Sequence, residues 1–260
     1  MDKHTARWLT NMTSTFYAQV STSFDATRQT PWPGWDHVLE LLGCCDASTQ
    51  GRGGTIPGPH GATLTAQPLK VLDVACGNLR FERYIHARCS LREAWCVDNC
   101  DALLRQGKGG EYLRYVRLDV ARELQDAHEL ALPPEAGGCD LAVCFGFMHH
   151  LPLASQRLDL LRTLVDATRP DGLVAVSFWQ FLRDPRIRAK ALSFEGADKG
   201  DYLLGWQDRS DVARYCHHFE EAEVDRLVYG VRGLAQQVCR YSADGRGGDL
   251  NRYVILRRRV

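Results

Sequence analysis

The 260-residue sequence has no excess of charge of either sign and contains very little lysine. Its 32 basic and 32 acidic residues give a formal net charge of zero, and only five of the basic residues are lysines. Affinity for nucleic acid rests largely on the neutralisation of phosphates by Lys and Arg. The balance therefore excludes a protein that binds nucleic acid through its overall charge, and we expect the basic run 257–259 to be a solvated end.

The sequence also lacks a C-x-x-C pair, although it contains ten cysteines. Cys44 and Cys45 are adjacent, and Cys96 and Cys100 are four residues apart. Closely paired cysteines would indicate a zinc or redox site, whereas Cys96 lies in an apolar run, where a thiol behaves as a small hydrophobic group. We therefore expect no metal, no disulfide framework and a reduced chain.

No apolar run approaches the roughly 18 residues of a membrane span. The N-terminus is polar and shows no pattern of a secretion signal. These absences predict a cytoplasmic chain with no membrane partner.

The most informative stretch that is present covers residues 70–80, KVLDVACGNLR. Residues 71–74 form a short apolar run typical of a parallel strand buried on both faces. A turn of small residues, 75–78, leads into helical spacing of apolar residues. Asp73 lies near the end of the first strand, and Asp98 closes the next apolar strand. This pattern is typical of a nucleoside-binding α/β sheet, in which the second acid bonds the ribose hydroxyls.

The turn lacks the glycines of a dinucleotide site. The motif G-x-G-x-x-G lets backbone N–H groups approach a pyrophosphate, but Ala75, Gly77 and Arg80 occupy the corresponding positions. An acid just before the turn, Asp73, would repel phosphates, whereas it suits an ammonium group. A dinucleotide cofactor is therefore disfavoured.

LDVACG, followed by an acid at the next strand end, resembles motifs one and two of the class I S-adenosylmethionine-dependent methyltransferases. The resemblance implies an α/β, Rossmann-like fold: a seven-stranded, mostly parallel sheet with an antiparallel C-terminal hairpin and helices on both faces. The alternative is a structural strand–turn–helix unit, and the sequence departs from the family at Ala75 and Leu79. The resemblance implies S-adenosylmethionine as cofactor, with binding residues Asp73, Ala75, Gly77, Asn78, Asp98, Asn99, Asp119, Val120 and Phe145.

Asp119 has two interpretations. It follows the alternating segment 112–118 and matches the family's third motif, where an acid approaches the adenine amino group. It is also well placed to cap a helix over residues 120–130, and one residue can do both.

We expect a single methyltransferase domain over residues 1–260. Residues 1–42 form an N-terminal helical or lid segment, with helices starting near residue 15 and at Asp36. Residues 43–67 form a flexible loop, because they are rich in Gly, Pro, Ser and Thr and lack periodicity, and residues 68–260 form the core. The expected core elements are strands at 71–74, 94–97, 112–118, 139–145 and 173–179, helices at 99–105, 155–168, 184–194 and 221–227, and a hairpin of 228–241 with 251–257.

A double histidine follows the most apolar strand, residues 139–145. Ligands of open α/β sheets bind at the carboxyl ends of the strands, at the switch point. We expect His149 to face the cleft and His150 to support the following helix; the alternative is that both are structural.

Three further segments resemble one family within this class, the tRNA methyltransferases that esterify the carboxymethyl group of the wobble uridine. The segments are FDATRQTPWP at 24–33, MHHL with Arg157 downstream, and DYLLGW followed by RYCHHFEEAEVDRL at 214–227. The sequence departs from the family at Gly205 and Cys216. By resemblance, His149 and Arg28 are catalytic, and the acceptor side comprises Arg28, Trp32, His149, Arg157, Tyr215 and His217.

The predicted function is therefore methyl transfer to a carboxylate on tRNA, and a small activator subunit is a further possible partner. A carboxylate needs no general base, and Arg28 or Arg157 would orient it by two-pronged hydrogen bonds. The main alternative is O- or N-methylation of a small metabolite, in which His149 is a plausible base. A third alternative is a module that binds the cofactor without turnover.

Overall fold

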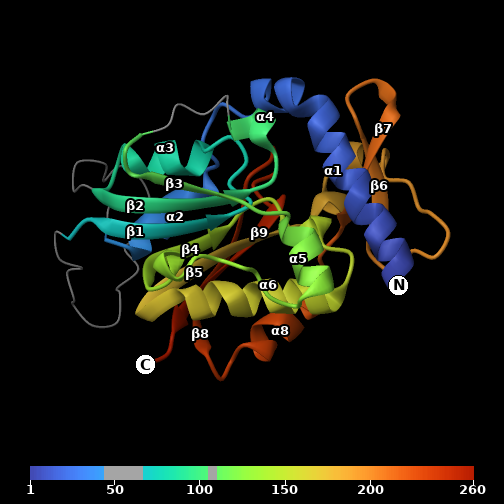
Figure 1. The fold of residues 1–260 in the computed structure, drawn as a ribbon. Helices are drawn as coiled ribbons and strands as arrows, with labels where there is room; N and C mark the ends of the chain where they lie inside the picture. Colours follow the sequence, from blue (N-terminus) through green and yellow to red (C-terminus); the bar gives the residue numbers. More distant parts are fainter. Residues whose placement is uncertain (44–66, 105–109) are drawn as a thin grey trace.

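The computed structural model describes residues 1–43, 67–104 and 110–260 (Figure 1). The loop expected over residues 43–67 therefore lies almost wholly outside the described residues. Within the described ranges, no helix combines the length and the apolar character that crossing a bilayer requires.

The central element is a seven-stranded sheet with the order β3-β2-β1-β4-β5-β9-β8. Strands β1 to β5 are parallel, β9 runs antiparallel to β5, and β8 runs antiparallel to β9. The chain builds outward from β1 to β3 and then returns to place β4 on the other side of β1, so the switch point lies between β1 and β4. This confirms the expected fold. The strands are β1 (Leu69–Val74), β2 (Leu91–Asp98), β3 (Leu113–Arg117), β4 (Cys139–Cys144), β5 (Thr168–Trp179), β8 (Ala235–Ala243) and β9 (Asn251–Arg258).

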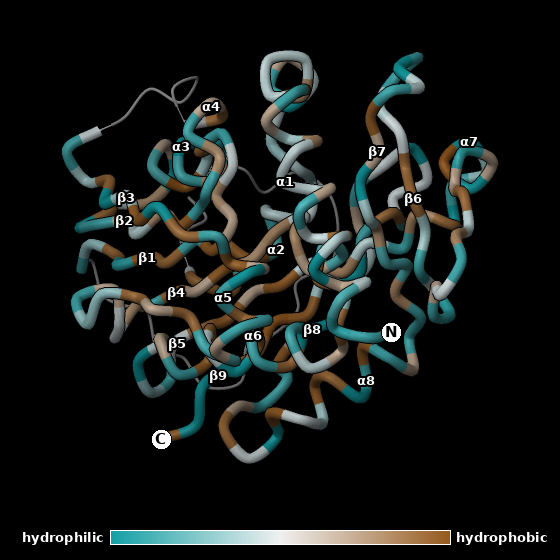
Figure 2. Tube along the Cα trace, turned by 45° about the vertical axis from the view of Figure 1, so that its right-hand side comes forward, coloured by the Kyte–Doolittle hydropathy of each residue, from teal (hydrophilic) through white to brown (hydrophobic). Residues whose placement is uncertain are grey.

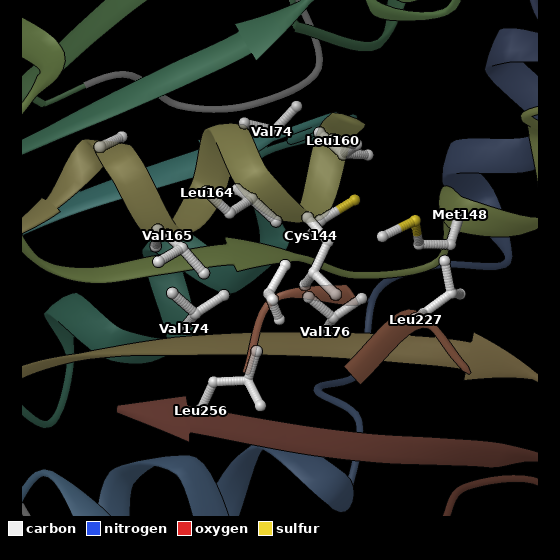
Figure 3. Packing of buried hydrophobic residues seen from close by; sticks show 14 of the residues in the cluster. Val74, Cys144, Met148, Leu160, Leu164, Val165, Val174, Val176, Leu227 and Leu256 are labelled. Atoms are coloured by element: carbon white, nitrogen blue, oxygen red, sulfur yellow. The ribbon is translucent and has the colours of Figure 1, made fainter. Parts of the chain in front are cut away.

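Helices cover both faces of this sheet, as expected. Apolar side chains of α5 (Val120–Asp126), α6 (Ala154–Ala167) and α8 (Glu221–Gly230) pack on one face, and those of α2 (Gly34–Leu41) and α3 (Arg80–His86) pack on the other. Figure 3 shows the first core, where side chains of β4, β5 and α6 converge. Figure 2 shows apolar residues concentrated in the central strands.

Alternation along β1 determines where Asp73 lies. Leu72 and Val74 belong to the core under α5 and α6, whereas Val71 belongs to the core under α2 and α3. Side chains of a strand point alternately to the two faces. Asp73 therefore lies on the α3 side of the sheet, at the carboxyl end of the strand.

A 24-residue helix, α1 (Lys3–Ala26), and a separate two-stranded sheet lie beside the carboxyl ends of the central strands (Figure 1). The small sheet pairs β6 (Asp201–Trp206) with β7 (Arg209–His217) in antiparallel register. Phe16 and Val20 of α1 pack against Trp206 and Val212. The helix and the small sheet thus form one layer.

One prediction about this layer is wrong, and one of its strands is not predicted by the sequence. Helix α1 begins at Lys3 rather than near residue 15, because the carboxylate of Asp2 accepts hydrogen bonds from the backbone N–H groups of His4 and Thr5. The sequence pattern does not predict strand β7, because its first three residues are exposed and polar and its last four are all buried, so no alternation marks it.

The helix expected over residues 184–194 is also shorter than predicted. Only α7 (Pro185–Arg188) is helical, and the backbone of Leu192 instead pairs with that of Leu203 in β6. The remaining short elements are α4 (Asp101–Leu104) and the 3-10 turns η2 (Pro134–Ala136), η3 (Met148–His150) and η4 (Phe181–Arg183).

Candidate active site

A cavity of about 500 Å³ lies where β1, β2 and β4 end, under α1. Its volume is within the range of small-molecule sites. The residues predicted from sequence that line it are Arg28, Trp32, Asp73, Ala75, Gly77, Asn78, Asp98, Asn99, Asp119, Val120, Phe145 and His149. The structure therefore brings the whole predicted cofactor set and part of the predicted acceptor set to one cavity.

The turn after β1 places backbone groups against Asp98. Gly77 has φ of +56° and donates its N–H to Asp98 Oδ2 at 2.9 Å, and Cys100 N–H donates to Oδ1 at 2.8 Å. Burial raises the pKa of Asp98, and these N–H donors oppose that effect. A carboxylate oxygen can accept two hydrogen bonds. The backbone N–H of Asn99 also acts on this carboxylate, which lines the cavity with acceptor capacity suited to the hydroxyls of a ribose.

Asp73 shares its position with a second acid that the sequence reasoning missed, Glu82 of α3. Both carboxyl groups are buried, and Asp73 Oδ1 and Glu82 Oε2 accept no hydrogen bond from another group. Burial, and then the charge of Glu82, raise the pKa of Asp73 well above its ordinary value. Two facing buried carboxyl groups are satisfied when they share one proton. The pair then presents one negative charge, which suits an ammonium group of a cofactor.

Asn78 holds the N-terminal segment on the turn. Its side-chain amide donates to Asp25 Oδ1 at 2.7 Å and to the carbonyl of Arg28 at 3.0 Å. The amide nitrogen is therefore used within the protein. A contact of Asn78 with the cofactor stays a prediction.

Asp119 is the N-cap of α5. Its carboxylate accepts from the N–H of Arg122 at 3.1 Å, so the capping interpretation is confirmed. Asp119 also lines the cavity, and its contact with an adenine stays a prediction.

Two arginines line the cavity from the α1–β7 layer. The guanidinium of Arg28 lies 4.6 Å from the ring of Phe24, and that of Arg214 lies 4.6 Å from the ring of Phe16. Both lie 5.8 Å from the ring of Trp206. Within the described residues, neither forms an ion pair with a carboxylate. Burial lowers the pKa of Arg28, and a guanidinium still keeps its charge at neutral pH.

His149 reaches the cavity from η3, directly after β4. Its ring packs against Trp179 and His150, and its Nδ1 is buried without a hydrogen-bond partner. Burial, and then the neighbouring His150 and Arg214, lower its pKa well below 6.5. The ring is therefore neutral at physiological pH.

His150 joins the α1–β7 layer to the central sheet. Its Nδ1 lies 2.8 Å from the carbonyl of Tyr215 and its Nε2 lies 2.8 Å from the hydroxyl of Tyr17. Because a carbonyl only accepts, Nδ1 carries the proton and Nε2 accepts from Tyr17. Burial lowers the pKa of His150 to about 3. The ring supports α1 and β7 rather than the following helix, which corrects the prediction.

The other predicted acceptor residues, Arg157, Tyr215 and His217, do not line the cavity. Arg157 donates to Glu223 Oε1 at 2.7 Å and to the Tyr215 hydroxyl at 3.0 Å. Tyr215 in turn donates to Asp201 at 2.6 Å, and the two ring nitrogens of His217 contact Asp201 and Glu223. These side chains are buried and satisfy one another, so the structure places them in a network that joins α6, α8 and the small sheet.

Sequence reasoning missed Glu82, Arg214 and Tyr17 as site residues. Arg214 is the first residue of the motif at 214–227, and this position in the motif is the signal that could have identified it. Glu82 lies one helical turn after Asn78, but a single sequence does not show which face of α3 turns toward Asp73. Tyr17 lies on α1, and only the packing of this helix over the cavity shows that Tyr17 lines it.

The comparisons with known proteins agree with this geometry. Residues 71–172 match the family model described as "Methyltransferase domain". The chain is 26% identical over 250 residues to the tRNA (carboxymethyluridine(34)-5-O)-methyltransferase ALKBH8 of Macaca fascicularis, which covers 92% of this chain and 29% of that protein. The Mus musculus protein of the same name is 25% identical over 192 residues, or 71% of this chain and 22% of that protein. The chain thus spans less than a third of the length of these relatives.

Solved structures support the fold. An S-adenosylmethionine-dependent methyltransferase from Methanosarcina mazei superposes with a TM-score of 0.57 at 16% identity, covering 74% of this chain and 93% of that one. A DhpI–SAH complex superposes with a TM-score of 0.58 at 14% identity, covering 96% and 97%. These superpositions show the fold of S-adenosylmethionine-dependent methyltransferases, and residues 71–172 within that fold match the methyltransferase domain.

Proposed function

We propose that the chain methylates a carboxylate, and that this carboxylate belongs to the carboxymethyl group of the wobble uridine of a tRNA. The observation that carries the proposal is the pair of Arg28 and Arg214, which line one cavity without a carboxylate partner within the described residues. Arginine binds carboxylates through a planar fork of N–H donors. Two guanidinium groups held near one Trp206 ring therefore favour an anionic acceptor.

The state of His149 supports the same acceptor class. A neutral histidine whose pKa is well below 6.5 is a weak base. An alcohol or amine acceptor would need its proton removed, whereas a carboxylate is ionised at neutral pH. His149 then contributes by packing and hydrogen bonding at the cavity wall.

When bound, S-adenosylmethionine supplies an electrophilic methyl group. Asp98 would hold its ribose and the Asp73–Glu82 pair its ammonium group, at the ends of neighbouring strands. The arginine pair would orient the acceptor from the opposite layer, and the α1–β7 layer would exclude water. Alignment of the two reactants is the main contribution that such a site makes, since orientation can lower a barrier by several kcal/mol.

The relatives that match most of the chain support the tRNA acceptor. The name of the Macaca fascicularis relative states a tRNA carboxymethyluridine substrate, and the matched region covers 92% of this chain. Arg28 and Trp32, from the segment 24–33, lie at the cavity, as does Arg214.

The test is incubation with methyl-labelled S-adenosylmethionine and separate tRNA, protein and small-molecule fractions. We expect label in tRNA that is released by mild base, as an ester requires. Loss of one charge-assisted hydrogen bond costs about 1.5–3 kcal/mol, so Arg214→Met should lower kcat/KM for the acceptor about 10- to 100-fold. Its cofactor affinity should not change.

Arg92→Met is the matched control, because Arg92 is an exposed residue of β2 outside the cavity. It should leave both parameters unchanged. Base-stable label in tRNA would contradict the carboxylate acceptor.

A second candidate is the methylation of a small carboxylate metabolite. The formal net charge of zero favours it, because tRNA affinity rests largely on phosphate neutralisation. Base-labile label found only in the small-molecule fraction would support this candidate and refute the tRNA acceptor.

A further inference from the structure

Three side chains at the junction of η3 and β7 bring metal-ligating atoms together. His149, His150 and Cys216 each offer one such atom, and these atoms all lie within 4.8 Å of one another. All three residues are buried. A tetrahedral zinc ion, with Zn–N of about 2.0–2.1 Å and Zn–S of about 2.3 Å, holds two nitrogens and one sulfur roughly 3.3–3.6 Å apart. Movements of about 1 Å would therefore complete the geometry.

His149 offers a nitrogen without a partner among the described residues, and His150 offers a lone pair that is occupied only by the Tyr17 hydroxyl. His149 Nδ1 is buried and unpartnered, which is costly for a polar atom. His150 directs Nδ1 to the carbonyl of Tyr215, so Nε2 is the nitrogen with the lone pair. A hydrogen bond from one ring nitrogen to a backbone carbonyl is the usual support of a metal-ligating histidine.

Cys216 is a free, buried thiol on β7. When a thiol binds zinc, its S–H bond breaks and the proton passes to solvent, while each neutral imidazole contributes an existing lone pair. One thiolate and two imidazoles form a soft donor set that suits Zn²⁺ and not Mg²⁺ or Ca²⁺.

We propose that His149, His150 and Cys216 bind a zinc ion whose fourth coordination position faces the cavity. Three protein ligands and one open position are the arrangement of reactive zinc sites. The open position follows from the cavity, because both histidines line it and Cys216 does not. The fourth ligand is a water molecule or an oxygen of the acceptor.

Two neighbouring side chains, those of Arg214 and Tyr17, lower the zinc affinity of this site. The charge of Arg214, which lies on the same strand, opposes a cation, and one thiolate compensates one of the two zinc charges. The hydroxyl of Tyr17 occupies the lone pair of His150 Nε2 in the metal-free arrangement. Zinc must displace this hydrogen bond, so Tyr17 lowers the affinity.

The proposal is independent of the acceptor assigned above, and its test requires no methyl transfer. The metal-free protein is titrated with Co²⁺, which occupies zinc sites and gives a thiolate-to-metal absorption band together with the visible bands of tetrahedral cobalt. We expect one equivalent to bind. Zn²⁺ should then displace the Co²⁺ and abolish the bands.

Cys216→Ser should remove the thiolate band, and His149→Gln should weaken Co²⁺ binding at least about tenfold. Tyr17→Phe should strengthen it, because the competing hydroxyl is gone. Cys239→Ser, at a partly exposed free cysteine of β8, is the control and should match the unchanged protein. Thermal unfolding and cofactor binding verify that each variant is folded.

Failure of the folded, unchanged protein to give the thiolate band would overturn the proposal. A band that persists in Cys216→Ser or is lost in Cys239→Ser would also overturn it. Because the readout is spectroscopic, a wrong acceptor assignment would leave these results unchanged.

Discussion

Glu223 offers the sharpest test of the buried network that contains Arg157, Tyr215 and His217. Its two carboxylate oxygens accept from Arg157 at 2.7 Å and from His217 at 2.7 Å. Glu223→Ala would remove the nearer ionic partner of Arg157, whose side chain is only 4% exposed, and would leave Asp201 Oδ1 at 3.9 Å as its other carboxylate. The remaining hydrogen-bond partners of Arg157 are two carbonyl groups and the Tyr215 hydroxyl.

The expected loss is large because the pair is buried. Removing one partner of a buried ion pair costs about 3–5 kcal/mol, and the 16% exposure of Glu223 places this case near the lower end. A loss of about 3 kcal/mol corresponds to a fall in Tm of about 6–12 °C at this chain length. Cofactor affinity should not change, because Glu223 lies outside the cavity.

The measurement is urea denaturation with a parallel thermal scan. Glu220→Ala is the matched control: Glu220 pairs with Lys199, and the two side chains are 53% and 82% exposed. Such a surface pair contributes about 0–1 kcal/mol. If Glu223→Ala unfolds like the control and instead raises the KM for the acceptor, the network belongs to the substrate site and the structural explanation is refuted.

Three further predictions concern the cofactor side, acid stability and the cavity mouth. Asp98→Ala removes the proposed acceptor of the ribose hydroxyls and also the acceptor of two backbone N–H groups of the turn. The Kd for S-adenosylmethionine should therefore rise at least about tenfold in calorimetry. An unchanged Kd would exclude binding of the ribose by Asp98. Burial alone would raise the pKa of Glu223, but its hydrogen bonds outweigh burial and lower the pKa below 4.5. The folded state therefore binds a proton at Glu223 less readily than the unfolded state does. The stabilisation from ionised Glu223 is present above pH 4.5 and is lost as the pH falls through the pKa of Glu223 in the folded state. Glu223→Ala should therefore flatten the acid limb of a curve of stability against pH. Gly146 and Gly196 both have positive φ, but a Cβ at Gly146 would lie 2.9 Å from Trp32, so Gly146→Ala should lose more stability than Gly196→Ala, whose cost of about 1–2 kcal/mol is backbone strain alone; equal losses would contradict the tight contact.

The central sheet and the cofactor side could be predicted because their information is local. Apolar runs define β1, β2 and β4, and the acids and small residues of the turn follow them directly. In a parallel sheet, residues that follow neighbouring strands meet at one edge. The sequence pattern alone therefore predicts that Asp73 and Asp98 belong to one site.

The acceptor side depends on packing between segments far apart in the sequence. Arg214 and His217 belong to one sequence motif, but only the structure shows that Arg214 faces the cavity and that His217 contacts Asp201 and Glu223. The two residues are three positions apart on β7, so they point to opposite faces of this strand, which the sequence pattern does not predict. A motif gives the identity of such residues but not the direction in which they point.

The cavity is lined by the matched methyltransferase domain and by two segments that lie outside this domain in the sequence. The match to the methyltransferase domain covers residues 71–172, whereas Arg28, two residues after the end of α1, and Arg214 of β7 lie before and after it. Changes in α1 or β7 can therefore reshape one wall without moving the strand ends that hold Asp73 and Asp98. Exchange of these two segments between relatives should therefore change the acceptor specificity while the cofactor-binding residues stay the same.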